Sequence, residues 1–186
     1  MIYKSEYIIL IILSLIIMTS CSTFHAPTYV GSIENVIAIK DRSEGSKNNV
    51  RINEFKAAST VNQKLMCRAA GPVKPSTGDT FQKYIEDALR NELYQAGIYK
   101  SDAKVQIDGL LKRIHFESMG SSSWDIELEL SSTTGTSYTV SILYEFSGSW
   151  TATHACRDGA EALVGAVQAL ILKVIEHPDF KKLIGA

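Results

Sequence analysis

The sequence predicts a single α+β domain, a two-layer sandwich in which two amphipathic helices cover one face of a mainly antiparallel sheet. Residues 103–116, 124–130 and 138–146 alternate apolar and polar side chains, which indicates strands with one buried face. Residues 80–96 and 159–176 repeat apolar side chains every three or four positions, which indicates helices with one buried side. Packing these helices on the apolar face of the sheet buries all of these surfaces at once.

The pattern is weaker before the first helix. Residues 36–39 (Val-Ile-Ala-Ile) predict a strand, the polar residues 40–49 an exposed loop, and residues 50–55 a second strand. Residues 66–79 contain two glycines and two prolines, which predicts an irregular loop around Cys67.

The first helix carries signals at both ends. Asp79, with Gln82 three residues later, resembles a capping box, and Gly97 stands where a left-handed residue ends many helices. Four polar residues are expected on its solvent side: Lys83, Glu86, Arg90 and Gln95.

The three alternating segments are separated by short polar connections, residues 119–123 and 131–137. These connections are typical of hairpins, so we expect an antiparallel meander, with Gly109 as a candidate bulge. Asp158 is expected to precede the second helix and to form another capping box with Glu161, and the helix ends before Pro178.

Composition excludes some classes of function. The 186 residues carry 19 Lys+Arg against 20 Asp+Glu, for a net charge of −1. A nucleic-acid-binding domain would need a basic excess, so no nucleic acid is expected as a partner. The chain is 45% hydrophobic and 21% charged, which excludes intrinsic disorder.

An export signal is predicted at the start of the chain. Lys4 precedes the apolar run 8–18, which is interrupted only by Ser14. At 1.5 Å per residue a helix of this run spans roughly 16 Å, about half of a membrane core, so a secretory signal is favoured over a spanning helix.

The residues Met18-Thr19-Ser20-Cys21 resemble the bacterial lipobox. The resemblance implies cleavage before Cys21, a thioether to diacylglycerol on its sulfur and acylation of its new amine. Ser22 follows where Asp would imply retention in the inner membrane, so the resemblance implies the outer membrane. The alternative is a plain anchor helix with a chance cysteine.

These signals divide the chain into a signal peptide (1–20), a lipidated cysteine with a tether (21–32) and a single periplasmic domain (33–186). Residues 22–32 lack helical periodicity and contain Pro27 and Gly31, which predicts the tether.

The order of elements is similar to that of small Gram-negative lipoproteins of the YajG-like family. The likeness is carried by residues 81–97, followed by Ile98-Tyr99, and by residues 167–184 with their His177-Pro178-Asp179-Phe180 sequence. Lipopolysaccharide-assembly and transport-auxiliary lipoproteins have similar layouts. The family implies no catalytic residues.

Besides the lipidated Cys21, the exported chain contains two cysteines, Cys67 and Cys156, and each precedes one of the helices. In an oxidising compartment two such thiols normally pair, and adjacent helices on one sheet would bring them together. We therefore predict a Cys67–Cys156 disulfide; the alternative is two buried free thiols.

No catalytic or metal-binding pattern is present. His154-Ala155-Cys156 has a possible metal spacing but supplies too few ligands, and the other histidines lie far apart in the sequence. There is no nucleophile elbow, P-loop or dinucleotide fingerprint. Asp125, Glu127 and Glu129 follow the solvent side of a strand. We expect no enzyme, metal or cofactor.

The leading hypothesis is a lipid-anchored, non-catalytic interaction protein of a cell-envelope assembly, with an envelope protein as its partner. The alternative is a lipid or glycan carrier with a groove between sheet and helices; an envelope hydrolase ranks third. The aromatic residues that could line such a groove are more readily explained as core: Trp124, Tyr138, Tyr144, Phe146 and Trp150. The surface expected to face solvent is acidic and rich in hydroxyls: Asp125, Glu127, Glu129, Thr139, Ser141, Leu143 and Glu145.

Overall fold

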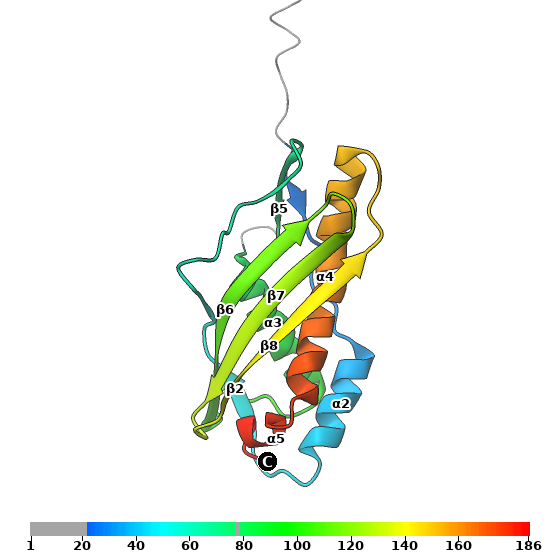
Figure 1. Ribbon diagram of the computed structural model, residues 1–186. Helices are drawn as coiled ribbons and strands as arrows, with labels where there is room; N and C mark the ends of the chain where they lie inside the picture. The colour runs from blue at the N-terminus through cyan, green and yellow to red at the C-terminus, as the bar shows by residue number, and fades with distance from the viewer. Residues whose placement is uncertain (1–21, 77–78) are drawn as a thin grey trace, which may run out of the picture.

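The computed structural model describes residues 22–76 and 79–186 and confirms the α+β fold (Figure 1). Its larger sheet has the strand order β2-β6-β7-β8, and β3 also pairs with β6. The long central strands form the expected antiparallel meander, whereas β2 and β3 run parallel to β6. The bounds are β2 Val50–Ile52, β3 Lys56–Ala57, β6 Val105–Glu117, β7 Ser122–Ser132 and β8 Ser137–Phe146.

The alternation of β7 produces the buried face of the sheet. Trp124, Ile126, Leu128 and Leu130 are each at most 1% exposed. The bulge of β6 is not at Gly109, as expected, but at Lys112, where the register shifts between Leu111 and Arg113. A Cβ atom on Gly109 would lie 2.6 Å from the Phe55 ring, so this glycine makes room for that side chain.

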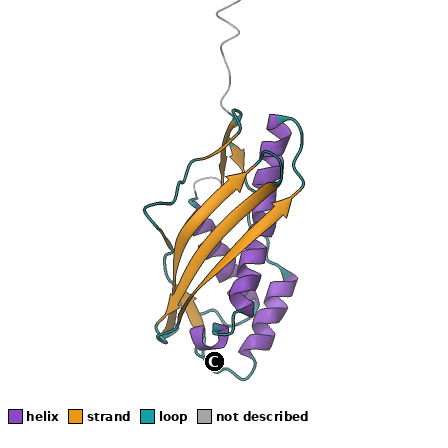
Figure 2. Cartoon of the chain, in the orientation of Figure 1, coloured by secondary structure: helices purple, strands orange, loops and turns teal. Residues whose placement is uncertain are grey.

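The two predicted helices, α3 (Phe81–Gln95) and α4 (Ala152–Glu176), cover the apolar face of the sheet, and the short α5 (Phe180–Leu183) follows α4. Figure 2 shows the helices on one side of the strands. The core between the two layers contains large, fully buried side chains, among them Phe81, Trp124 and Phe180. The two-layer sandwich is therefore confirmed.

The predicted caps are wrong at two helix starts, although the end of α3 is as expected, with Gly97 at φ +84°. Thr80 rather than Asp79 caps α3, and its side chain accepts from the Lys83 N–H. The first turns of α4 precede the predicted start, because Ala155 and Cys156 are already buried there. Asp158 lies within that helix and accepts hydrogen bonds from Ser149 instead.

The strand predicted at residues 36–39 is wrong, since this segment belongs to helix α2 (Ile33–Ser43). Ser32 caps this helix by accepting from the Asn35 N–H. Asn35 and Ile39, four residues apart, share the buried side of α2, which packs against α3 and α4 rather than on the sheet. These tertiary contacts override the strand preference of the β-branched residues.

A smaller sheet replaces two predicted irregular segments. Its order is β1-β5-β4, with β1 parallel to β5 and β4 antiparallel to it. The loop predicted over residues 66–79 thus contains a hairpin, and residues 22–32 are not the free tether that we expected. Phe24, Leu65 and Val73 are buried on this sheet and account for the difference. The bounds are β1 Phe24–His25, β4 Leu65–Cys67 and β5 Gly71–Lys74.

Candidate functional site

The predicted lipidation site, Cys21, and the signal peptide 1–20 lie outside the described residues. The residue after Cys21 lies against the domain: a Cβ atom on Gly71 would lie 1.8 Å from the Ser22 carbonyl oxygen. Further along, the Ala26 N–H donates to the Lys74 carbonyl at 2.8 Å. Within the described ranges, no helix has both the length and the hydrophobicity needed to cross a membrane.

Cys67 and Cys156 lie together, as predicted, although Cys67 is on a strand of the smaller sheet and Cys156 lies within α4 rather than before it. Their Cα atoms are 5.6 Å apart, their sulfur atoms are at bonding distance, and both side chains are fully buried. The pair connects β4 of the smaller sheet to the second turn of α4. The geometry thus allows the predicted disulfide to join the smaller sheet to the helical layer.

The outer face of the sheet carries the expected acids, but basic side chains of β6, which were not expected there, pair with them. Arg113 donates to both carboxylate oxygens of Asp125, at 2.9 and 3.0 Å, and also contacts Glu127. The Lys112 Nζ lies 3.3 Å from a carboxylate oxygen of Glu129. These cations come from β6, whose bulge places two successive basic residues on the outside. The three acids Asp125, Glu127 and Glu129 thus each have a basic side chain of β6 as a neighbour.

An open groove of about 620 Å³ runs beside these ion pairs, between the outer face and the loop that precedes β4. Thr60 and Asn62 line one wall, and Arg113 and His115 line the other. Apolar side chains also line it: Val61, Leu65 and Ile114. Because the groove is open to solvent and one wall is charged, it suits the surface of a protein better than an acyl chain.

The outer face continues onto β8, which pairs only with β7 among the described strands and therefore has a free edge. Leu143, near its middle, is 66% exposed. An edge strand with an exposed apolar residue beside charged neighbours is a surface to which another protein can bind. We call the groove, the ion pairs and β8 the outer sheet surface.

The space between sheet and helices is filled by the aromatic residues that could have lined a carrier groove. Trp124 donates its indole N–H to the Gly159 carbonyl at 2.9 Å, and the Tyr138 hydroxyl donates to the Val174 carbonyl at 3.0 Å. Tyr144 and Phe146 are partly buried against the same core. Trp150 differs from the others, because its side chain is fully exposed.

The histidines are dispersed. The His25 ring lies 3.1 Å from the Pro75 carbonyl, His154 bonds the Thr151 hydroxyl, and His177 stacks on Tyr138 with ring centroids 3.9 Å apart. The described residues contain no group of three His, Cys, Asp or Glu side chains placed to hold a metal ion.

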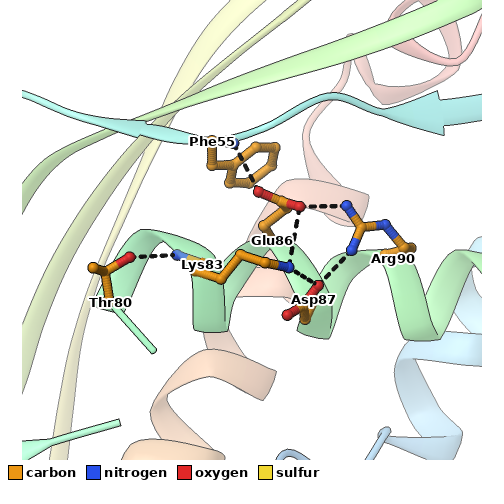
Figure 3. Close-up of polar contacts among 6 residues, drawn as sticks. All are labelled: Phe55, Thr80, Lys83, Glu86, Asp87 and Arg90. Carbon is orange, nitrogen blue, oxygen red and sulfur yellow. Dashed lines mark hydrogen bonds and ion pairs between the residues drawn. The ribbon is translucent and has the colours of Figure 1, made fainter. Parts of the chain in front are cut away.

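Glu86 is buried, although its position on α3 predicted a solvent-facing side chain. It is 3% exposed, and its carboxylate accepts from the Phe55 N–H at 2.8 Å (Figure 3). Lys83 and Arg90 contact its other oxygen. The connection between β2 and β3 covers this part of α3, so Glu86 attaches that connection to the helix.

A second buried carboxylate, Glu92, was not anticipated from the sequence. The Tyr29 hydroxyl, the Ser32 N–H and the Asn35 side-chain amide all donate to its Oε1 atom, the last two at 3.1 Å. Its Oε2 atom is buried without a hydrogen-bond partner among the described residues. Burial raises the pKa of Glu92 despite the three donors. Glu92 thus connects the N-terminal segment and α2 to α3.

We expect Glu92→Gln to change how stability depends on pH. Between the ordinary and the raised pKa of Glu92, the folded state binds more protons than the unfolded state, so the free energy of unfolding falls as pH rises. In the glutamine variant the side chain does not titrate, so this fall in the free energy of unfolding is absent. Its stability relative to wild type should therefore increase with pH, as measured by urea denaturation from acidic to mildly alkaline buffer.

The control for this experiment is Glu161→Gln, because that side chain is exposed on α4. The stability of the Glu92 variant relative to wild type could instead stay constant or fall as pH rises. That result would show that burial does not raise the pKa of Glu92.

Comparisons with known proteins support the fold class. The chain is similar to protein XCC0632 of Xanthomonas campestris, assigned to the family DUF330, with a TM-score of 0.52 and 10% identity over 83% of this chain and 95% of that chain. An uncharacterised protein of known structure has a TM-score of 0.46 and 9% identity, over 82% and 99% of the two chains. No protein-family model and no curated protein matches the sequence. Similarity at this level of identity shows the fold alone.

Proposed function

We propose that this chain is an outer-membrane lipoprotein of the YajG-like type, anchored through Cys21 and facing the periplasm, where it serves as a non-catalytic component of a cell-envelope assembly. The observation that carries the proposal is the Met18-Thr19-Ser20-Cys21 sequence placed directly before a folded domain. The buried Cys67–Cys156 pair supports it, because a disulfide at these positions needs an oxidising compartment.

The anchor is tested by metabolic labelling with an acyl-chain probe. We expect the wild-type protein to incorporate the probe and to fractionate with the outer membrane. Cys21→Ala should lose the label, because the thioether needs that sulfur, while Cys67→Ala should keep it. An unlabelled wild-type protein would contradict the anchor.

The interaction role is assigned to the outer sheet surface. Its open groove, lined by both charged and apolar side chains, and its free β8 edge offer ion pairs, hydrogen bonds and an exposed leucine to a protein partner. The carrier alternative needs an apolar cavity between sheet and helices, and Trp124, Phe81 and Phe180 occupy that space. The packing therefore favours docking over carriage.

The docking surface is tested by placing a photo-crosslinking amino acid at Leu143 in intact cells, followed by mass spectrometry of the adducts. The matched control is Ile37, an aliphatic residue of similar exposure on α2, 53% against 66%. We expect a discrete protein adduct from position 143 and none from position 37. The reverse pattern would assign docking to the helices, and adducts from neither position would refute docking on the outer sheet surface.

A further inference from the structure

Several loops meet at the end of the domain where the described chain begins. Ser22 lies against Gly71, in the hairpin of β4 and β5, and this hairpin also carries the buried Cys67. Figure 1 shows β5 and the first turns of α4 at this end, together with the ends of the long strands. We call the β4–β5 turn, the β6–β7 turn and the loop between β8 and α4 the anchor end.

Arg68 holds these loops together. Its guanidinium group donates to the Ser118 carbonyl at 2.6 Å, in the β6–β7 turn, and to the Trp150 carbonyl at 2.8 Å, in the loop before α4. Arg68 itself adopts a positive φ of +48°, which is uncommon for a residue other than glycine. The side chain thus connects the two loops, and both terminal nitrogens of its guanidinium group donate to backbone carbonyls.

The two braced loops each present a large apolar side chain to solvent. Met119, next to Ser118, is 70% exposed, and the Trp150 side chain is fully exposed. Met66, on strand β4 next to Cys67, is 59% exposed. Exposed apolar side chains on loops that are fixed in position, rather than free to fold back, are typical of a binding surface.

We propose that the anchor end rests on the membrane, with Trp150 and Met119 in the headgroup region of the bilayer that holds Cys21. This inference extends the proposed function, since it rests on lipidation of Cys21.

The argument for a bilayer as the occupant comes from where the described chain begins. Ser22 lies against the hairpin, and strand pairing with β5 begins at Phe24. Cys21 precedes Ser22 directly, and consecutive Cα atoms are about 3.8 Å apart. Acyl chains on Cys21 would therefore enter the membrane beside this end of the domain, with no free tether between. Tryptophan also prefers the membrane interface, where its ring is partly in lipid and its N–H reaches water.

The experiment uses the full, lipidated chain reconstituted into phosphatidylethanolamine/phosphatidylglycerol vesicles whose acyl chains are brominated, since bromine quenches tryptophan on contact. Flotation of the vesicles first reports whether the protein is anchored. We then expect brominated vesicles to remove most of the fluorescence contributed by Trp150, obtained as the difference between wild type and Trp150→Phe. Trp124 alone, in that variant, should be little quenched because it is buried in the core.

The matched control carries Trp150→Phe together with Tyr94→Trp. Tyr94 is 70% exposed near the end of α3, where Ile98 accepts a hydrogen bond from Val50 beside the start of β6, away from the anchor end. We expect this tryptophan to be unquenched. Protein that fails to float overturns both the anchor and the inference. Protein that floats while Trp150 stays unquenched overturns the inference alone and leaves the anchor end open to a protein, and equal quenching at both positions refutes a fixed orientation.

Discussion

Replacing Cys67 and Cys156 together by serine is expected to lower the free energy of unfolding by about 4–5 kcal/mol. The two cysteines are 89 residues apart, so a disulfide removes a large amount of chain entropy from the unfolded state. It also fastens β4 to α4, which have no other covalent link nearby. Urea denaturation of the oxidised wild type and of the double variant measures this difference.

Reduction provides the control for this experiment. A reductant should bring the stability of the wild type close to that of the double variant and should leave the double variant unchanged. Native protein with both thiols free to alkylation after unfolding without reductant would contradict the disulfide, and the expected difference would then disappear.

The second large effect is expected at Trp124, where substitution by alanine should cost about 3–5 kcal/mol. The side chain is fully buried, and its ring packs against Phe116 and Phe81 with centroids 4.8 and 6.0 Å away. Its removal leaves a cavity between sheet and helices, and the hydrogen bond from the indole N–H to the Gly159 carbonyl is lost. Chemical denaturation measures the loss.

Trp150 is the matched control, because it is also a tryptophan but its side chain is fully exposed. In the purified protein in detergent-free buffer, Trp150→Ala should change the free energy of unfolding by about 0.5 kcal/mol or less. Similar losses for the two variants would show that Trp124 does not belong to the core.

The elements that could be predicted are those whose side-chain pattern is set by one buried face. The strand β7 alternates because Trp124 and Ile126 point into the core while Asp125 and Glu127 point out. The helix α3 shows its stripe for the same reason. In such elements each side chain's position depends on local periodicity, which a sequence displays directly.

The elements that were missed depend on contacts with distant segments. Val36 to Ile39 are as compatible with a strand as with a helix, and the choice is made by Asn35 reaching Glu92 and the Gln168 carbonyl. Phe24 is buried where β1 pairs with β5 and contacts α4. The sequence around Asn35 and Phe24 contains no pattern that predicts these distant contacts.

The polar features of the site were missed for a similar reason. Glu86 and Glu92 have the spacing of ordinary helix-surface acids, and their burial follows from chain segments 31 and 63 positions away that cover them. The anchor end is likewise assembled from three separate turns around Arg68. The cysteine pair could be predicted because two thiols in an exported chain normally pair, but the β4–α4 contact that brings the two residues together was not foreseen.

The mass of the intact protein, extracted from the membranes of a bacterium that expresses the full chain, tests the lipoprotein assignment most directly. We expect a chain that starts at Cys21, carries diacylglycerol and an amide-linked acyl group, and lacks the thiol hydrogens of Cys67 and Cys156. An unmodified chain from Met1 to Ala186 with all cysteines reduced would contradict the anchor, the compartment and the orientation on the membrane together.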